Sequence, residues 1–147
     1  GKAFNNVWSI IEDKKGYIWF GDNDGLWRYD PSANFDSAQH KSLKAGDKTF
    51  TKVSQNGAYA IIEDRKGNIW TTGEVNLQVW ALSRYDHKTL YNKNPTVTQI
   101  KSGGPALLGI LEANDGSIWF GALGLESGVH RYDGKTITHF KSKVEQQ

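Results

Sequence analysis

The sequence repeats itself three times, and this repetition constrains the fold more than any other feature. The phrase EDKKGYIWFG at residues 12–21 returns as EDRKGNIWTTG at 63–73 and as EANDGSIWFG at 112–121. The tryptophans in the three phrases are 51 and 49 residues apart. Because self-similarity at a fixed period is the signature of repeat architectures, each copy is expected to form one supersecondary unit.

Each copy is predicted to contain four short β-strands. In the first copy, blocks rich in β-branched and aromatic residues stand at VWSIIED (7–13), YIWFG (17–21), LWRYD (26–30) and TFTKVS (49–54). Turn residues bound these blocks, and no segment keeps a helical apolar period. Tandem four-stranded units of about fifty residues are typical of β-propeller blades. The chain is therefore predicted to be all-β, a single propeller unit with blades at 1–55, 56–103 and 104–147.

The repeated string resembles a known family, the two-component regulator propeller repeat. The resemblance lies in Gly-x-Ile-Trp, followed downstream by Arg-Tyr-Asp, in all three copies. It implies a sensor module of the kind found in the exported regions of hybrid histidine kinases, and hence a periplasmic or secreted location. The second copy also resembles, more weakly, the virginiamycin B lyase type of propeller. Two departures from the repeat are the TT at 71–72 and Ala113 in place of an aspartate.

Three blades cannot close a ring alone, because closed propellers have at least four. Their Trp-rich flanks would remain exposed, which is typical of an interface. We therefore expect a homodimer in which two chains, head to tail, complete a six-bladed ring about a two-fold axis. The alternative is that the sequence is a fragment or the open end of a larger array. The absence of methionine indicates that its native start is missing.

Three sets of residues recur at matched positions and are expected to belong to the scaffold. They are the tryptophans Trp19, Trp70 and Trp119, the glutamates Glu12, Glu63 and Glu112, and the arginines Arg28, Arg84 and Arg131. The tryptophans are expected to pack between blades, and the charged residues to satisfy one another or the backbone there. The alternative for the charged sets is a ring of carboxylates or guanidiniums around the central channel.

A ligand site is expected where the copies differ, above all in the loop between the second and third strands. In a propeller this loop emerges on the same face as the linkers between blades. The candidate ligand-binding residues on that face are Trp8, Tyr59, Glu74, Asn76, Trp80 and Glu126. Aromatic rings beside carboxylates and amides suit an oligosaccharide at the channel mouth. The alternative is that the aromatics only pack and the loops are solvated. The insertion at 31–49 is expected to be a surface loop on the opposite face.

Composition and motifs argue against several function classes. The net charge of +2 is too small for a nucleic-acid groove, and no apolar run is long enough to span a membrane. The sequence has no cysteine, no His-x-x-x-His pair and no phosphate-binding or dinucleotide loop, so we predict neither a metal nor a cofactor. The prediction is a non-enzymatic ligand-recognition or protein-interaction module. The alternatives are a stand-alone lectin and a lyase-like enzyme that would use Glu74, Glu126 or His130 as acid or base.

Overall fold

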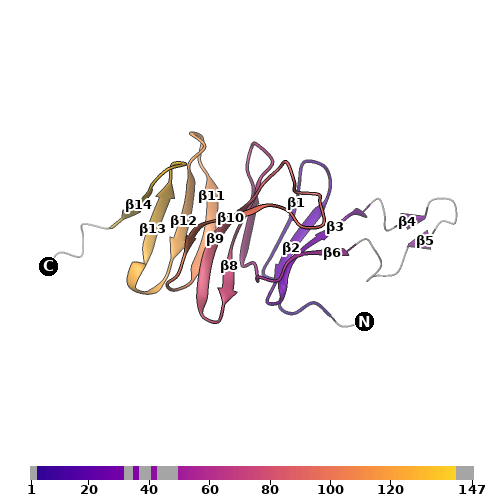
Figure 1. Ribbon diagram of the computed structural model, residues 1–147, viewed down its shortest axis with the longest axis horizontal. Coiled ribbons are helices and arrows are strands. Elements are labelled where there is room, and N and C mark those ends of the chain that lie inside the picture. Colours follow the sequence, from indigo (N-terminus) through magenta and orange to yellow (C-terminus); the bar gives the residue numbers. More distant parts are fainter. Residues whose placement is uncertain (1–2, 32–34, 37–40, 43–49, 142–147) are drawn as a thin grey trace.

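The structure, a computed structural model, describes residues 3–31, 35–36, 41–42 and 50–141. Three four-stranded antiparallel sheets stand side by side in chain order (Figure 1), and each sheet is one blade. The predicted all-β class with three four-stranded blades is thereby confirmed.

Strand pairing follows chain order within each blade. Blade 1 contains β1 (Ser9–Glu12), β2 (Ile18–Asp22), β3 (Gly25–Tyr29) and β6 (Phe50–Ser54). Blade 2 contains β7 (Ala60–Glu63), β8 (Ile69–Asn76), β9 (Val79–Tyr85) and β10 (Val97–Ser102). Blade 3 contains β11 (Leu107–Glu112), β12 (Ile118–Ala122), β13 (Gly128–Tyr132) and β14 (Ile137–Phe140). The short 3-10 helix η2 (Gly124–Glu126) joins β12 to β13.

The predicted insertion of blade 1 lies between β3 and β6. Within it, β4 (Phe35–Asp36) and β5 (Lys41–Ser42) pair in a separate two-stranded sheet. Most of the insertion lies outside the described residues, and so does the prediction that it sits on the opposite face. Among the described residues, no helix is long and apolar enough to cross a membrane.

One turn is built three times, between the first and second strands of each blade. In blade 1 the backbone N–H of Asp13 donates to the Tyr17 carbonyl (2.8 Å), and that of Gly16 donates to the Asp13 carbonyl (2.9 Å). Gly16 has a φ of 90°, a left-handed conformation that strains any residue with a Cβ. The matched Gly67 and Gly116 have φ values of 92° and 85°. The recurring glycine of the sequence repeat is therefore fixed by this turn.

Two hydrophobic clusters fill the spaces between blades. Because side chains alternate between the two faces of a strand, each blade can present one face to each neighbour. The first cluster joins Trp19 and Leu26 of blade 1 to Ile61 and Ile69 of blade 2. The second joins the opposite face of blade 2 to blade 3, with the buried members Trp70, Leu82, Leu107, Ile118, Phe120 and Ala122. The first strands β1, β7 and β11 are neighbours, as expected for strands that line a propeller axis.

Candidate functional site

A cavity of about 430 Å³ opens where the first strands of the three blades begin. Its wall includes Trp8, which precedes β1, Tyr59, which precedes β7, and Leu108 in β11. These three residues occupy matched positions in the repeat, so one wall contains the same position from every blade. Glu74 and Trp80, near the ends of the β8–β9 hairpin, add the second wall. Four of the six candidate ligand residues, Trp8, Tyr59, Glu74 and Trp80, therefore line one cavity.

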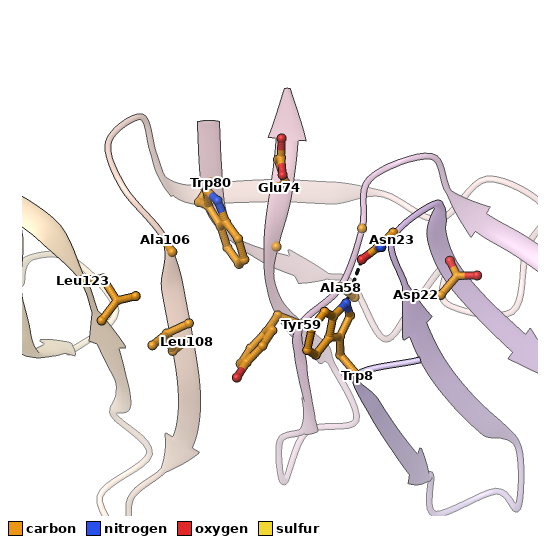
Figure 2. Close-up of a pocket in the computed structure, with 12 residues that line it drawn as sticks. Trp8, Asp22, Asn23, Ala58, Tyr59, Glu74, Trp80, Ala106, Leu108 and Leu123 are labelled. Atoms are coloured by element: carbon orange, nitrogen blue, oxygen red, sulfur yellow. Dashed lines mark hydrogen bonds between the residues drawn. The ribbon is translucent and has the colours of Figure 1, made fainter. Parts of the chain in front are cut away.

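The aromatic side chains form a continuous row. The ring centroids of Trp8 and Tyr59 are 5.3 Å apart at 36°, and those of Tyr59 and Trp80 are 6.2 Å apart at 64°. Figure 2 shows Tyr59 and Trp80 between Trp8 on one side and Leu108 and Leu123 on the other. Trp8 is 55% exposed, so its ring remains open to a ligand from solvent. The result is a wide apolar surface at the mouth of the row of first strands.

Polar groups hold the rim of this surface in place. The indole Nε1–H of Trp8 donates to the side-chain oxygen of Asn23 (2.7 Å), which fixes the plane of the ring. Oε1 of Glu74 accepts the backbone N–H of Gln78 (2.8 Å), a contact within the β8–β9 hairpin. The second carboxylate oxygen of Glu74 has no hydrogen-bond donor among the described residues. One carboxylate oxygen of Glu74 can therefore accept a hydrogen bond from a ligand at the edge of the aromatic row.

The other two candidates do not line the cavity. Asn76 is exposed at the end of β8 and pairs with Val79 across the hairpin, which carries it beyond the rim. Glu126 lies in η2 and forms an ion pair with Lys101 (3.2 Å), which holds it away from the lining. The hydrogen bond and the charge of Lys101 lower the pKa of the Glu126 carboxyl. The sequence places both residues in the correct loops but does not reveal how those loops turn.

Sequence reasoning did not propose the other lining residues as ligand-binding, among them Asn23 and Leu123. Asn23, in the β2–β3 turn, orients Trp8, and Leu123, just before η2, closes the far side of the cavity. Both lie in the loop between the second and third strands of a blade. Sequence reasoning compared the lengths of these loops between copies and did not consider each of their side chains. The close approach of two glycine backbones was also missed: a Cβ on Gly73 would lie 1.8 Å from the Gly57 carbonyl oxygen. That contact brings the linker into blade 2 against β8 and sets the floor of the cavity.

The comparisons with known proteins agree with this architecture. Residues 1–24 match the family model described as two component regulator propeller. The predicted family resemblance is thereby confirmed. The comparison with curated proteins gave no match.

Two solved structures of the extracellular domain of BT4673 from B. thetaiotaomicron resemble the chain. One describes the parent protein as a one component system and the other as a hybrid two component system. Identities are 20% and 19%, TM-scores are 0.60 and 0.61, and the matches cover 90% and 94% of this chain. The chain spans only 16% and 17% of the length of those chains. At this identity the likeness establishes the fold.

The repeat tryptophans lie on β2, β8 and β12, and Trp19 and Trp70 pack against the blade that follows their own. Trp19 is fully buried and Trp70 is 4% exposed, whereas Trp119 is partly exposed, because no blade follows it in the described chain. The indole N–H groups of Trp19 and Trp70 donate to carboxylates of their own turns, Asp13 and Asp64, both at 2.8 Å. In blade 3 the aspartate is replaced, and the Trp119 indole donates to the Ser117 hydroxyl instead (3.1 Å).

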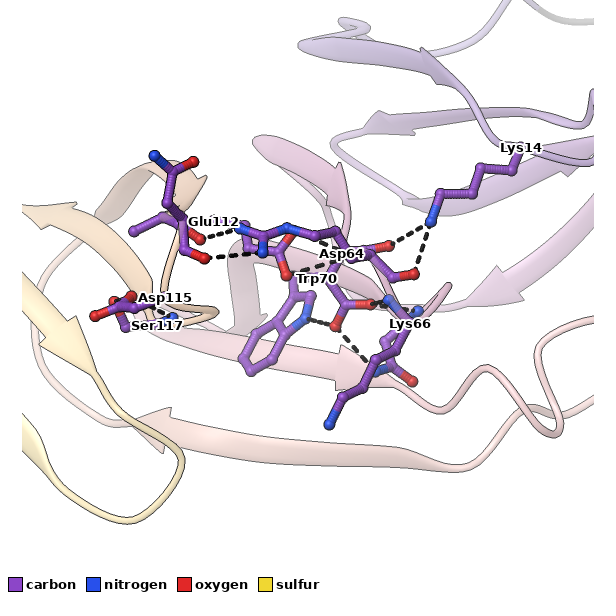
Figure 3. Close-up of polar contacts among 11 residues, drawn as sticks. Lys14, Asp64, Lys66, Trp70, Glu112, Asp115 and Ser117 are labelled. Atoms are coloured by element: carbon purple, nitrogen blue, oxygen red, sulfur yellow. Dashed lines mark hydrogen bonds and ion pairs between the residues drawn. The ribbon is translucent and has the colours of Figure 1, made fainter.

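The repeat glutamates of blades 2 and 3 accept hydrogen bonds from the turn of the preceding blade. Glu63 accepts the backbone N–H of Lys14 (3.0 Å), and Glu112 accepts that of Arg65 (3.1 Å). Burial raises the pKa of Glu63 against the opposing effect of the Lys14 N–H. The basic side chains extend the same contact: Lys14 donates to the Arg65 carbonyl (2.8 Å), and Arg65 donates to the carbonyls of Ala113 and Asn114 (Figure 3). We call each such pairing of turn N–H and glutamate an inter-blade clamp.

The repeat arginines lie beside the tryptophans. The guanidiniums of Arg28 and Arg84 lie 5.8 and 5.7 Å from the ring centroids of Trp19 and Trp70. Arg28 also donates to the Leu90 carbonyl of blade 2 (2.7 Å), and Arg131 forms an ion pair with Asp115 (3.1 Å). Within the described part of the chain, no group of three or more His, Asp or Glu side chains could hold a metal ion.

Proposed function

We propose that this chain is a non-enzymatic ligand-recognition module of the sensor type, which works outside the cytoplasm and binds an oligosaccharide in the cavity described above. The observation that carries the proposal is the row of Trp8, Tyr59 and Trp80 in the lining of the cavity, with the Glu74 carboxylate at its edge. Flat aromatic rings stack on the apolar faces of sugar rings, and rim carboxylates and amides accept hydrogen bonds from hydroxyls.

The proposed sensor role and the proposed location are supported by the proteins that this chain resembles. The matched family model is a two component regulator propeller, and the resembling structures are extracellular domains of signalling systems. In such a role a binding module needs affinity and selectivity for one ligand class rather than catalytic groups.

The cavity favours this proposal over the lectin and lyase alternatives. All three blades contribute to one cavity, so one ligand per chain is expected, whereas a lectin with a site in each blade would bind three. Of the residues that the lyase alternative would use, Glu74 lines the cavity, whereas Glu126 and His130 lie next to each other outside its lining, with Nε2 of His130 2.9 Å from the Glu126 carbonyl oxygen. Glu126 pairs with Lys101, and His130 is 2% exposed and stacks on Phe120 with ring centroids 5.1 Å apart.

The proposal is tested by calorimetry and by quenching of tryptophan fluorescence with maltohexaose, cellohexaose and xylohexaose as probes. Binding to at least one of them is expected with about one site per chain. Trp80→Ala and Tyr59→Ala should each weaken it by roughly tenfold or more, because stacking on an aromatic ring contributes on the order of 1 kcal/mol or more. Trp80→Phe, which keeps a ring, should lose less.

Leu77→Ala is the matched control, because Leu77 is 87% exposed at the tip of the same hairpin and outside the cavity lining. It should bind as the wild type does. Thermal unfolding of each variant checks that the fold is retained. Absence of binding to all three probes, or binding that Trp80→Ala and Tyr59→Ala leave unchanged, would contradict the proposal.

A further inference from the structure

Each outer face of the row of blades carries apolar residues at positions that are buried inside the row. On the blade 1 face, Phe4 packs against Phe20 and Trp27, with ring centroids 4.8 and 5.1 Å apart, and leaves Ile10 exposed. Leu26 of blade 1 and Leu82 of blade 2 occupy matched positions and are both 0% exposed, because the following blade covers them. Val129 stands at the same position of blade 3 and is 47% exposed. The same face carries Leu111, which is 59% exposed. Blade 3 therefore presents the surface that blades 1 and 2 bury.

The opposite end of the row shows the complementary difference. Ile61 on β7 is 4% exposed, because it packs against Trp19 and Leu26 of the preceding blade. Ile10 holds the matched position on β1 and is 64% exposed. The open face of blade 3 also holds a shallow groove of about 270 Å³, lined by Leu111, Trp119 and Val129 among others. A side chain placed like Ile61 would enter such a groove.

The polar contacts are incomplete at the same two ends. Inside the row, the clamps join Lys14 to Glu63 and Arg65 to Glu112. By repeat position, the next donor is the backbone N–H of Asn114 and the missing acceptor is the carboxylate of Glu12. Among the residues that the structure describes, neither group has a hydrogen-bond partner. The donor of a third clamp therefore lies in blade 3 and its acceptor in blade 1, at opposite ends of the row.

We propose that a second copy of this chain covers the open face of blade 3 with its own blade 1, and that the backbone N–H of Asn114 donates to the partner's Glu12. The reciprocal contact forms at the other end, so the two chains close a ring of six blades about a two-fold axis. The occupant is identified by continuity with the internal interfaces. It must present a β-branched side chain and a turn glutamate in one register, as Ile10 and Glu12 do.

The third clamp is weaker than the two internal ones, and this gives a gain-of-function test. Lys14 and Arg65 add side-chain bonds to carbonyls of the next turn, whereas the short, neutral side chain of Asn114 cannot. Asn114→Arg should therefore strengthen the dimer, by roughly fivefold or more in its dissociation constant. Glu12→Leu should weaken it by at least as much.

The decisive experiment is light scattering on single and mixed variants. The wild type should have twice the chain mass of 16.5 kDa at high concentration. Ile10→Glu and Val129→Glu each place a charge in both contacts of a homodimer, so each alone should be monomeric. Mixed together they should form a dimer again, because one of the two contacts then joins two unaltered faces. Both positions are exposed in the single chain, so its fold is not at risk.

Leu77→Glu is the control for the charge change, since it lies away from both faces; it should remain dimeric. A wild type that stays at 16.5 kDa at about 0.1 mM would overturn the proposal. So would dissociation by only one of the two face variants, which would mean that like faces pair. Assemblies that grow without limit as concentration rises would also overturn it, because the contacts would then fail to close. The test does not depend on any sugar, so it stands apart from the proposed ligand function.

Discussion

Replacing Asp64 with alanine should cost the chain a large part of its stability. The Asp64 carboxylate is 6% exposed and accepts four hydrogen bonds, from the backbone N–H groups of Lys66 and Asn68, the Asn68 amide and the Trp70 indole, all at 2.8–2.9 Å. The variant leaves the buried indole N–H without an acceptor, which costs about 1–3 kcal/mol, and also loses the backbone bonds to a charged group. The expected loss is about 3–4 kcal/mol, against a total of about 5–15 kcal/mol for a typical domain.

The assay is urea unfolding of wild type and Asp64→Ala at a series of pH values, followed by tryptophan fluorescence. Burial alone would raise the pKa of Asp64, but the hydrogen bonds from Trp70, Asn68 and Lys66 outweigh it and lower the pKa below its ordinary 3.8. A lowered folded-state pKa means that the contribution is fully present above pH 3.8 and is lost as the pH falls through the folded value. The gap between the two proteins should therefore be constant near neutrality and close in acid.

Ala113→Asp makes the opposite change at the matched position of blade 3, where the Trp119 indole now depends on Ser117. It should not destabilise the chain, and a gain of up to about 1 kcal/mol is expected. A loss below about 1 kcal/mol for Asp64→Ala, or a gap that widens as the pH falls, would refute the reasoning.

Two further predictions concern contacts between blades 1 and 2. Gly21→Ala should destabilise the chain by about 2 kcal/mol or more, because its Cβ would lie 2.2 Å from a backbone oxygen of Ala58. The matched Gly121→Ala has nothing within 4 Å of its Cβ in the single chain, so at a dilution where the chain is monomeric it should unfold as the wild type does. Equal loss in both variants would contradict this. Tyr91→Phe removes the hydroxyl that donates to the Asp13 carboxylate and should cost about 1–2 kcal/mol. Burial and the Asp13 hydrogen bond raise the pKa of Tyr91 above 10.0, so the difference from wild type should hold up to about pH 10 and shrink above it; a constant difference at higher pH would argue against the contact.

The fold could be predicted because its local chemistry repeats. The strand blocks predicted for the first copy, 7–13, 17–21, 26–30 and 49–54, each overlap one strand of blade 1, and their ends agree with the strand ends to within two residues. Each blade needs an apolar strand, a glycine with positive φ and a return strand. The same residue types therefore recur in the sequence at nearly constant spacing. Because the pattern occurs three times in one chain, it can be recognised by comparing the copies with one another, without related sequences.

The candidate site could be predicted only in part, for a physical reason. Trp8 and Tyr59 were accessible to sequence reasoning because each directly precedes the first strand of its blade, and the register of those strands carries them to the same edge. Asn76 ends β8 at the tip of its hairpin and Glu126 lies in η2, and at such positions the side-chain direction depends on contacts that are distant in sequence, such as the ion pair of Glu126 with Lys101. The position of such a residue in the sequence predicts the face of the propeller on which it lies, but not whether its side chain lines the cavity.

The same limit applies to a contact that the sequence did not reveal at all. The segment between β9 and β10 supplies Leu90, 1% exposed, and Tyr91, which fill the space between blades 1 and 2 at their turn end. The matched space between blades 2 and 3 is a cavity of about 340 Å³ whose lining includes Arg84 and Asp115. Nothing in the spacing of the repeat distinguishes a linker that folds inward from one that stays outside.

Three departures of the third copy from the repeat lie on its uncovered side. Ala113 replaces the turn aspartate, Asn114 replaces the basic clamp residue and Val129 replaces a leucine, while in blades 1 and 2 the corresponding residues lie at covered interfaces. A face covered by its own chain benefits from tight apolar packing and a full clamp at all times. A face covered by a second copy must also be stable when uncovered, which favours a smaller apolar residue and a neutral turn. In the proposed dimer, the contact between copies is therefore expected to be weaker than the contacts within a chain, so that such a dimer would dissociate on dilution before either chain unfolds.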